Sequence, residues 1–186
     1  MNSKQTRTIA IFATLVALMA ATRDHHFGSA LHLPDASLAI FLLAGFYLPR
    51  LALPALLIGA GLADYYAINY NGVSDWCVSS AYWFLIPTYA VMWYAGKFYA
   101  ARHSQSWRGL ALFAATASLA TSAAFVISSG SFYLFSGRFA GMTALQYAGS
   151  VAKYYLPYLS GTFLYLAIAA GVHVAAASYS RQSQPT

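Results

Sequence analysis

The chain has 186 residues, of which 60% are hydrophobic and only 8% are charged, and its formal net charge is +6. This number of charges is too small to cover the surface of a water-soluble globular protein. The composition therefore excludes a water-soluble globular protein and predicts an integral membrane protein. The Lys and Arg residues are scattered singly between apolar runs and form no stripe, which argues against a nucleic-acid partner.

Six apolar segments follow one another along the chain, separated by short polar connections. At about 20 residues per crossing, six helices use most of the sequence and leave no room for a second domain. We therefore expect an all-α integral membrane protein with one domain over residues 1–186, a single bundle of six transmembrane helices, and a polar C-terminal tail at 180–186. The segments are 8–22, 36–48, 51–68, 76–95, 109–128 and 152–178.

Prolines indicate where these helices begin or bend. Pro49 and Arg50 divide the second segment from the third and predict a tight helical hairpin. Pro87 and Pro157 fall inside the fourth and sixth segments, where the loss of a backbone donor predicts kinks.

The stretch between the fifth and sixth helices, residues 129–150, is too interrupted by Gly and Ser to predict a helix. We expect its aromatic residues to form a lid over a binding site, where Tyr133, Arg138 and Tyr147 are able to hydrogen-bond a bulky ligand. Tyr also gathers at membrane interfaces without any ligand, and this alternative stays open.

The distribution of Lys and Arg predicts the orientation of the bundle. With both termini in the cytoplasm, seven of the ten basic residues lie on the inner side, against Arg23, Arg138 and Lys153 outside. The same orientation places all four acidic residues on the outer side, so polar chemistry gathers there. They are Asp24, Asp35, Asp64 and Asp75.

Cys77 is the only cysteine and the main candidate for a metal ligand. We expect it at the outer start of the fourth helix, across the turn "NYNG" from Asp64, which ends "LIGAGLAD". A lone thiol forms no internal disulfide, and a thiolate suits soft or borderline metals. The alternatives are a small buried hydrophobic residue for Cys77 and a solvated helix-end carboxylate for Asp64.

Further protein ligands for a metal are scarce. The sequence has no HExxH or CxxC motif, and its only local histidine cluster is "DHH", which contains His25 and His26. A metal bound by Cys77 is therefore expected to arrive in a macrocycle that supplies its other ligands. At most one of the two histidines is expected to face a given site, as a rival ligand or as an interfacial histidine, and which of them does so stays open.

The six-helix plan, "RDHH" after the first helix, "GLADYY" at the end of the third and the lone cysteine in "SDWCVSSAYWF" resemble the BtuM family. These bacterial inner-membrane proteins are assigned to vitamin B12 uptake and are similar to the S-components of energy-coupling-factor transporters. The resemblance implies an S-component-like fold, a periplasm-facing site and cobalamin as the transported ligand, with Cys77 as axial ligand of its cobalt. It also implies that His25, Asp64 and Tyr82 line the pocket, but an ideal helix places Tyr82 roughly 140° from Cys77.

A thiolate opposite the upper axial ligand makes Cys77 a candidate catalytic residue for removing cyanide from cyanocobalamin with an external reductant, and whether the protein is an enzyme stays open. The chain has no G-x-x-x-x-G-K-[ST] loop, so we expect no nucleotide cofactor.

Energy for uptake then comes from elsewhere. Ala13, Ala17 and Ala21 give the first helix a face of small residues that permits close helix contact. The resemblance implies an energy-coupling-factor module as the partner of this face, and a solitary carrier surrounded by membrane lipids is the alternative. The other function class is a membrane haem- or copper-binding sensor or assembly factor that transports nothing, since haem also accepts a cysteine or histidine ligand.

Overall fold

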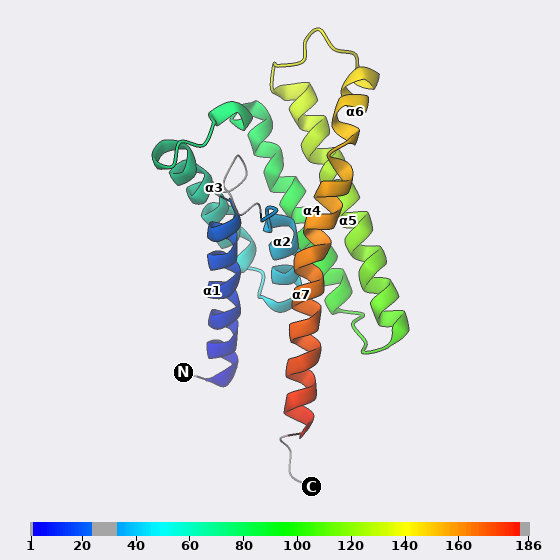
Figure 1. Ribbon diagram of the computed structural model, residues 1–186. Helices are drawn as coiled ribbons and strands as arrows, with labels where there is room; N and C mark the ends of the chain where they lie inside the picture. Colours follow the sequence, from blue (N-terminus) through cyan, green and yellow to red (C-terminus); the bar gives the residue numbers. More distant parts are fainter. Residues whose placement is uncertain (1, 24–32, 183–186) are drawn as a thin grey trace.

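The computed structural model describes residues 2–23 and 33–182, and this part of the chain is helical apart from its connections (Figure 1). Three of its helices are long and apolar enough to cross a membrane, which supports the predicted all-α membrane protein. They are α1 (Ser3–Arg23), α5 (Trp107–Phe135) and α7 (Tyr155–Gln182). The others are α2 (Ser37–Tyr47), α3 (Ala52–Tyr70), α4 (Leu85–Ala100) and α6 (Ala144–Ala152).

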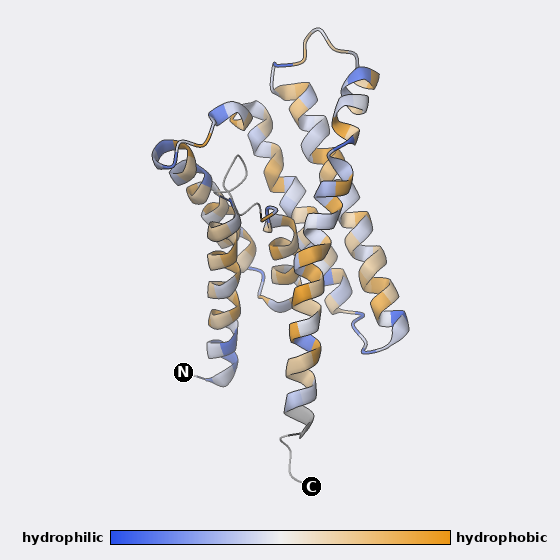
Figure 2. Cartoon of the chain, in the orientation of Figure 1, coloured by the Kyte–Doolittle hydropathy of each residue, from blue (hydrophilic) through white to orange (hydrophobic). Residues whose placement is uncertain are grey.

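The helix surfaces are apolar along their middles, and hydrophilic residues lie mostly toward the helix ends and in the connections (Figure 2). Leu119 and Val126 of α5 and Ile168 of α7 are 73%, 68% and 57% exposed. In water, so much exposed apolar surface is unusual for a monomeric protein. In a bilayer it faces hydrocarbon, which agrees with the composition.

The prediction of six transmembrane helices is met only in part. Helix α2 has 11 residues and α4 has 16, fewer than the roughly 20 that cross the hydrocarbon core alone. Eight of the 11 residues of α2 are buried, because α1, α4 and α7 pack around it. The short helix α2 therefore forms the centre of the bundle and not an independent membrane span.

Two glycines bring α2 and α4 into close backbone contact. A Cβ at Gly45 would lie 2.1 Å from the carbonyl oxygen of Trp93, and one at Gly96 would lie 2.0 Å from that of Leu42. No larger residue fits at either position without moving the helices apart.

Residues 129–150, for which the sequence predicts no helix, are helical over much of their length. Helix α5 continues to Phe135, and α6 begins after Thr143. The side chain of Thr143 accepts a hydrogen bond from the backbone of Gln146, whose side chain accepts one from the backbone of Thr143. This capping box satisfies the first backbone donors of α6, and the pattern Thr-x-x-Gln was visible in the sequence.

The fourth helix also begins later than expected. The predicted segment 76–95 starts with two 3₁₀ turns, η2 (Asp75–Cys77) and η3 (Ser80–Phe84), before α4. The hydroxyls of Ser74 and Ser79 accept hydrogen bonds from the backbone N–H groups of Trp76 and Ala81, which favours two short turns over one continuous helix.

The predicted proline kinks are wrong because both prolines lie at the start of a helix and not inside one. Pro87 lies in the first turn of α4 and Pro157 in the first turn of α7, where the missing N–H has no helical acceptor to lose. Helix α7 also continues to Gln182, into the expected tail 180–186, whose residues 183–186 lie outside the described part.

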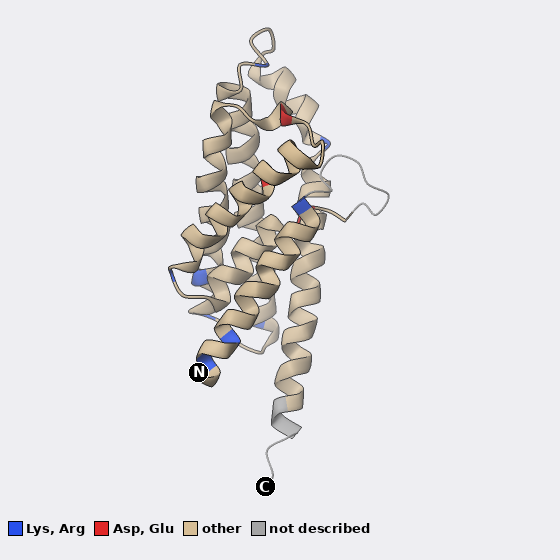
Figure 3. Ribbon diagram, turned by 90° about the vertical axis from the view of Figure 1, so that its left-hand side faces the viewer, with Lys and Arg blue, Asp and Glu red and all other residues tan. Residues whose placement is uncertain are grey.

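The first residues of α1 and the last of α7 lie at the same end of the bundle, which we call the terminal end (Figure 1). Most Lys and Arg gather toward this end, and the described aspartates lie toward the other, which we call the distal end (Figure 3). The charge asymmetry predicted from the sequence is therefore present in the fold.

Candidate functional site

Cys77 lies in the turn η2 between α3 and α4, and its side chain is exposed. The turn follows Gly72, whose positive φ of 68° reverses the chain after α3. It closes with a 2.7 Å hydrogen bond from the backbone N–H of Val78 to the carbonyl of Asp75. The thiol is therefore presented on a short turn and not, as predicted, at the start of a helix.

A second connection reaches this turn from α5. The guanidinium of Arg138 lies 3.9 Å from the centre of the Trp76 ring, a cation–π contact beside Cys77. Partial desolvation raises the pKa of the Cys77 thiol above its ordinary value, and the positive charge of Arg138 opposes this shift. The thiol is thus protonated near neutral pH, with a cation close by to favour the thiolate.

Asp64 is held in an ion pair beneath this turn. Its carboxylate faces the guanidinium of Arg23: Oδ1 accepts from Nε, and Oδ2 accepts from Nη2 at 2.7 Å. The hydroxyl of Tyr82 also donates to Oδ2, at 2.5 Å. The side chains of Arg23 and Asp64 are 7% and 21% exposed, so Asp64 is not the solvated carboxylate of the alternative reading.

The other side of the guanidinium continues the network. Nη1 of Arg23 donates to the hydroxyl oxygens of Ser37 at 2.8 Å and Tyr89 at 2.9 Å. The Ser37 hydroxyl in turn donates to Asp35 at 2.6 Å. We call this set the Arg23 network; it consists of Arg23, Asp35, Ser37, Asp64, Tyr82 and Tyr89.

The Arg23 network joins α1, α2, α3, η3 and α4 at one point, and it brings two predicted site residues, Asp64 and Tyr82, into direct contact. Tyr82 and Cys77 lie in two different 3₁₀ turns, so the angular separation on an ideal helix does not apply to them. His25, the remaining predicted site residue, lies outside the described residues.

Sequence reasoning missed Arg23, Ser37 and Tyr89 as members of this site. In the sequence, Arg23 indicates the orientation of the bundle and belongs to the stretch "RDHH", but neither feature predicts an ion pair. An arginine at the end of an apolar helix, with aspartates in nearby connections, is the signal that could have suggested an ion pair, because a charge at membrane depth needs a partner. Which aspartate pairs with it depends on the packing of α1 against α3.

The tyrosines expected in the lid are engaged within the protein. The Tyr133 hydroxyl donates to the carbonyl of Met142 at 2.8 Å, and the Tyr147 hydroxyl donates to that of Ser129 at 2.9 Å. Their rings lie 4.9 Å apart between centroids. These contacts hold the connection between α5 and α6, which carries Arg138 to Trp76.

No group of three or more His, Cys, Asp or Glu side chains able to hold a metal ion occurs within residues 2–23 and 33–182. A metal at Cys77 therefore has no cage of such side chains in the described part of the chain. No family model matches the sequence, and no curated protein matches it closely enough to count as a relative. We therefore infer function from the residues and geometry of the chain itself.

Proposed function

We propose that this protein binds cobalamin in the bacterial inner membrane and serves its uptake, with Cys77 as an axial ligand of the cobalt. The observation that carries the proposal is the single exposed thiol on the turn η2 at the distal end. Such a thiol suits a metal whose remaining ligands come with it, as in a corrin ring. The resemblance of "SDWCVSSAYWF" and "GLADYY" to the BtuM family supports a corrin over other macrocycles.

The surroundings of Cys77 suit this chemistry. Coordination requires the thiolate, so binding releases the thiol proton, and Arg138 favours the resulting negative charge. The connections after α3 and α5 meet at Trp76 and Arg138, which gives a ring-shaped ligand an aromatic surface next to the sulfur. The Arg23 network beneath holds the helix ends that carry these connections, so Asp64 and Tyr82 position the site.

A thiolate on the lower face of the cobalt also favours removal of an upper cyanide ligand. In this step one electron from an external reductant takes the cobalt from the +3 to the +2 state, the cobalt–carbon bond breaks, and cyanide leaves with the bonding electron pair and takes up a proton. The electron comes from an external thiol or another donor, since the chain has a single cysteine.

The surface of α1 supports a partner for transport. Ala13, Ala17 and Ala21 are all exposed, so the row of small side chains faces away from the bundle. Small residues at this spacing permit close contact with another helix. We propose that this face meets a transmembrane coupling module, consistent with the absence of a P-loop motif from the sequence.

The decisive experiment compares intact protein with Cys77→Ala in the presence of cyanocobalamin. We expect the intact protein to bind and to shift the visible absorption of the corrinoid, and Cys77→Ala to lose the shift and most of the binding heat in calorimetry. Ser80→Ala, which alters an exposed serine in the same connection, is the matched control and should behave as the intact protein. Equal binding and identical spectra for intact protein and Cys77→Ala would refute the proposal.

The same protein samples distinguish the haem or copper alternative from cobalamin binding. Protein purified from cells grown with both cofactors would carry the absorption bands of haem and not of a corrinoid if that function were correct. Bound copper without a chromophore, measured by elemental analysis, would also exclude cobalamin as the cargo.

A further inference from the structure

A second candidate site lies at the terminal end, remote from Cys77. A cavity of about 480 Å³ opens between α2, α5 and α7 and the connection from α4 to α5. This volume is in the range that accommodates a small ligand or one lipid chain, and it is too small for a corrinoid, which is much larger than a drug-sized molecule. A corrinoid therefore does not fit this cavity.

The walls of the cavity change from apolar to polar toward its mouth. Its apolar wall includes Leu110 of α5 and Ala170 and Val174 of α7, and Leu110 and Val174 are 48% and 60% exposed. Its mouth is formed by the connection that contains Ser104 and Ser106. A ligand that fills it needs an apolar part inside and a polar part at the membrane surface.

Two histidines give the mouth hydrogen-bonding groups. His103 and His173 lie with their ring centroids 5.4 Å apart and their planes nearly perpendicular. Nδ1 of His173 is 2.7 Å from the Tyr47 hydroxyl, and Nδ1 of His103 is 3.0 Å from the Tyr99 hydroxyl. Where a tyrosine donates to Nδ1, the histidine carries its proton on Nε2, which is then a donor for a ligand oxygen.

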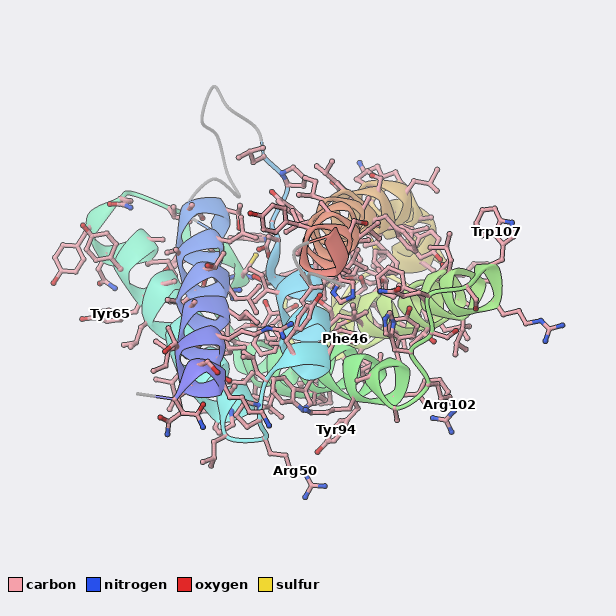
Figure 4. All side chains as sticks on the ribbon, turned by 90° about the horizontal axis from the view of Figure 1, so that it is seen from below. Phe46, Arg50, Tyr65, Tyr94, Arg102 and Trp107 are labelled. Carbon is pink, nitrogen blue, oxygen red and sulfur yellow. The ribbon has the colours of Figure 1, made fainter. Side chains whose placement is uncertain are left out.

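The charge around the mouth is positive. Seen from the terminal end, Phe46 lies near the centre of the bundle, and Arg50 and Arg102 project outward at its edge (Figure 4). Arg7 of α1 lies within electrostatic range of Tyr47 and His173. No described aspartate lies in the helix ends and connections that surround this mouth, so its field favours an anionic ligand.

We propose that this cavity binds one chain of an anionic phospholipid, with the headgroup phosphate at the mouth. The chain lies against Leu110, Ala170 and Val174, and the phosphate accepts hydrogen bonds from His103 and the serines of the connection. Basic pockets between transmembrane helices commonly recognise anionic headgroups in this way. This inference is independent of Cys77 and of cobalamin.

The test uses the full-length protein in detergent, with native mass spectrometry to count retained lipids. Dioleoyl phosphatidylglycerol is compared with dioleoyl phosphatidylcholine at equal concentration. We expect one phosphatidylglycerol to be retained in preference. Equal retention of the two lipids would overturn the proposal, and so would full protection against thermal unfolding by inorganic phosphate alone, since that would indicate an anion site without a lipid chain.

Ala170→Phe fills the cavity, and Ala175→Phe places the same bulk on an exposed part of α7 that does not line it. We expect Ala170→Phe to reduce retention of phosphatidylglycerol tenfold or more and Ala175→Phe to leave it unchanged.

Arg7→Gln provides a second measurement that does not depend on the folding of Ala170→Phe. It should lower the preference for phosphatidylglycerol about fivefold, because a basic residue near a headgroup contributes about that factor. An unchanged preference in Arg7→Gln would contradict the proposal.

Discussion

Polar side chains are arranged differently at the two ends of the bundle. At the distal end, Asp64 is bonded to both Arg23 and Tyr82, and the turn with Cys77 is exposed above them. At the terminal end, His103 and His173 border a cavity. The distal polar groups therefore fix the positions of helices, whereas the terminal polar groups remain accessible to a ligand.

The largest effect is expected from breaking the ion pair of the distal end. Arg23→Ala leaves Asp64 as an unpaired, mostly buried carboxylate, which should lower the free energy of unfolding by about 3–5 kcal/mol. Unfolding in mixed micelles, followed by far-UV circular dichroism, measures this change. Asp75→Asn, which alters an exposed aspartate in η2, is the control and should change stability by less than about 0.5 kcal/mol.

The double variant Arg23→Met with Asp64→Leu tests whether the instability of Arg23→Ala comes from the unpaired charge of Asp64. Apolar residues of similar size remove both charges, so this variant should recover most of the stability lost in Arg23→Ala. If Arg23→Ala were as stable as the intact protein, the Arg23 network would not hold the distal end together.

The next largest effect concerns the α2–α4 contact that connects the two ends. Gly96→Ala places a Cβ against the Leu42 carbonyl and should cost about 1–3 kcal/mol, because the helices must separate. Gly130→Ala in α5 is the control, since a Cβ there meets nothing within 4 Å. It should be neutral or stabilising by up to about 1 kcal/mol through helix propensity. Equal effects for the two variants would contradict tight packing at Gly96.

Much of the fold could be predicted from the sequence because it depends on local composition. The long apolar runs of α1, α5 and α7 require helices in a membrane, and these were expected within a few residues at most ends. The boundaries near residue 76 and residue 143 were not, because Ser74 and Thr143 decide them through single side-chain hydrogen bonds. Such bonds stabilise turns and helix starts without changing hydropathy.

The candidate site was predicted in part. Cys77 and Asp64 were selected as unusual residues, and the structure places Asp64 with Tyr82. Arg23 was missed as a partner because nothing local links it to Asp64, 41 positions away in the chain. The cavity with His103 and His173 was missed because it depends on the packing of helices distant in sequence.

The same chemical change at both ends compares them directly. Tyr82→Phe removes a donor to a charged carboxylate and should cost about 1.5 kcal/mol. Tyr47→Phe removes a bond to a histidine between two membrane helices and should cost only about 0.6 kcal/mol. Thermal unfolding of the two variants side by side measures the difference. A larger loss for Tyr47→Phe would show that polar contacts stabilise the terminal end more than the distal end, which would contradict the comparison.

The two proposed ligands should also differ in their response to pH. The pKa of the Cys77 thiol is raised, so below that pKa the free protein holds a proton that cobalt binding must release. Cobalamin affinity should therefore rise about tenfold per pH unit between about pH 6 and 8, as measured by calorimetry at several pH values. Phosphatidylglycerol retention should not follow this slope. A pH-independent cobalamin affinity would contradict thiolate coordination.

The smallest effect on stability is expected from the residue with the largest effect on binding. Cys77 is exposed on a turn closed by backbone hydrogen bonds, and among the described residues its sulfur is part of no core cluster. Cys77→Ala should therefore change the free energy of unfolding by less than about 0.5 kcal/mol, measured without ligand in the same micelles as Arg23→Ala. A loss above 1 kcal/mol would assign the sulfur to packing. An unchanged stability together with lost cobalamin binding separates the ligand-binding turn from the Arg23 network that supports it.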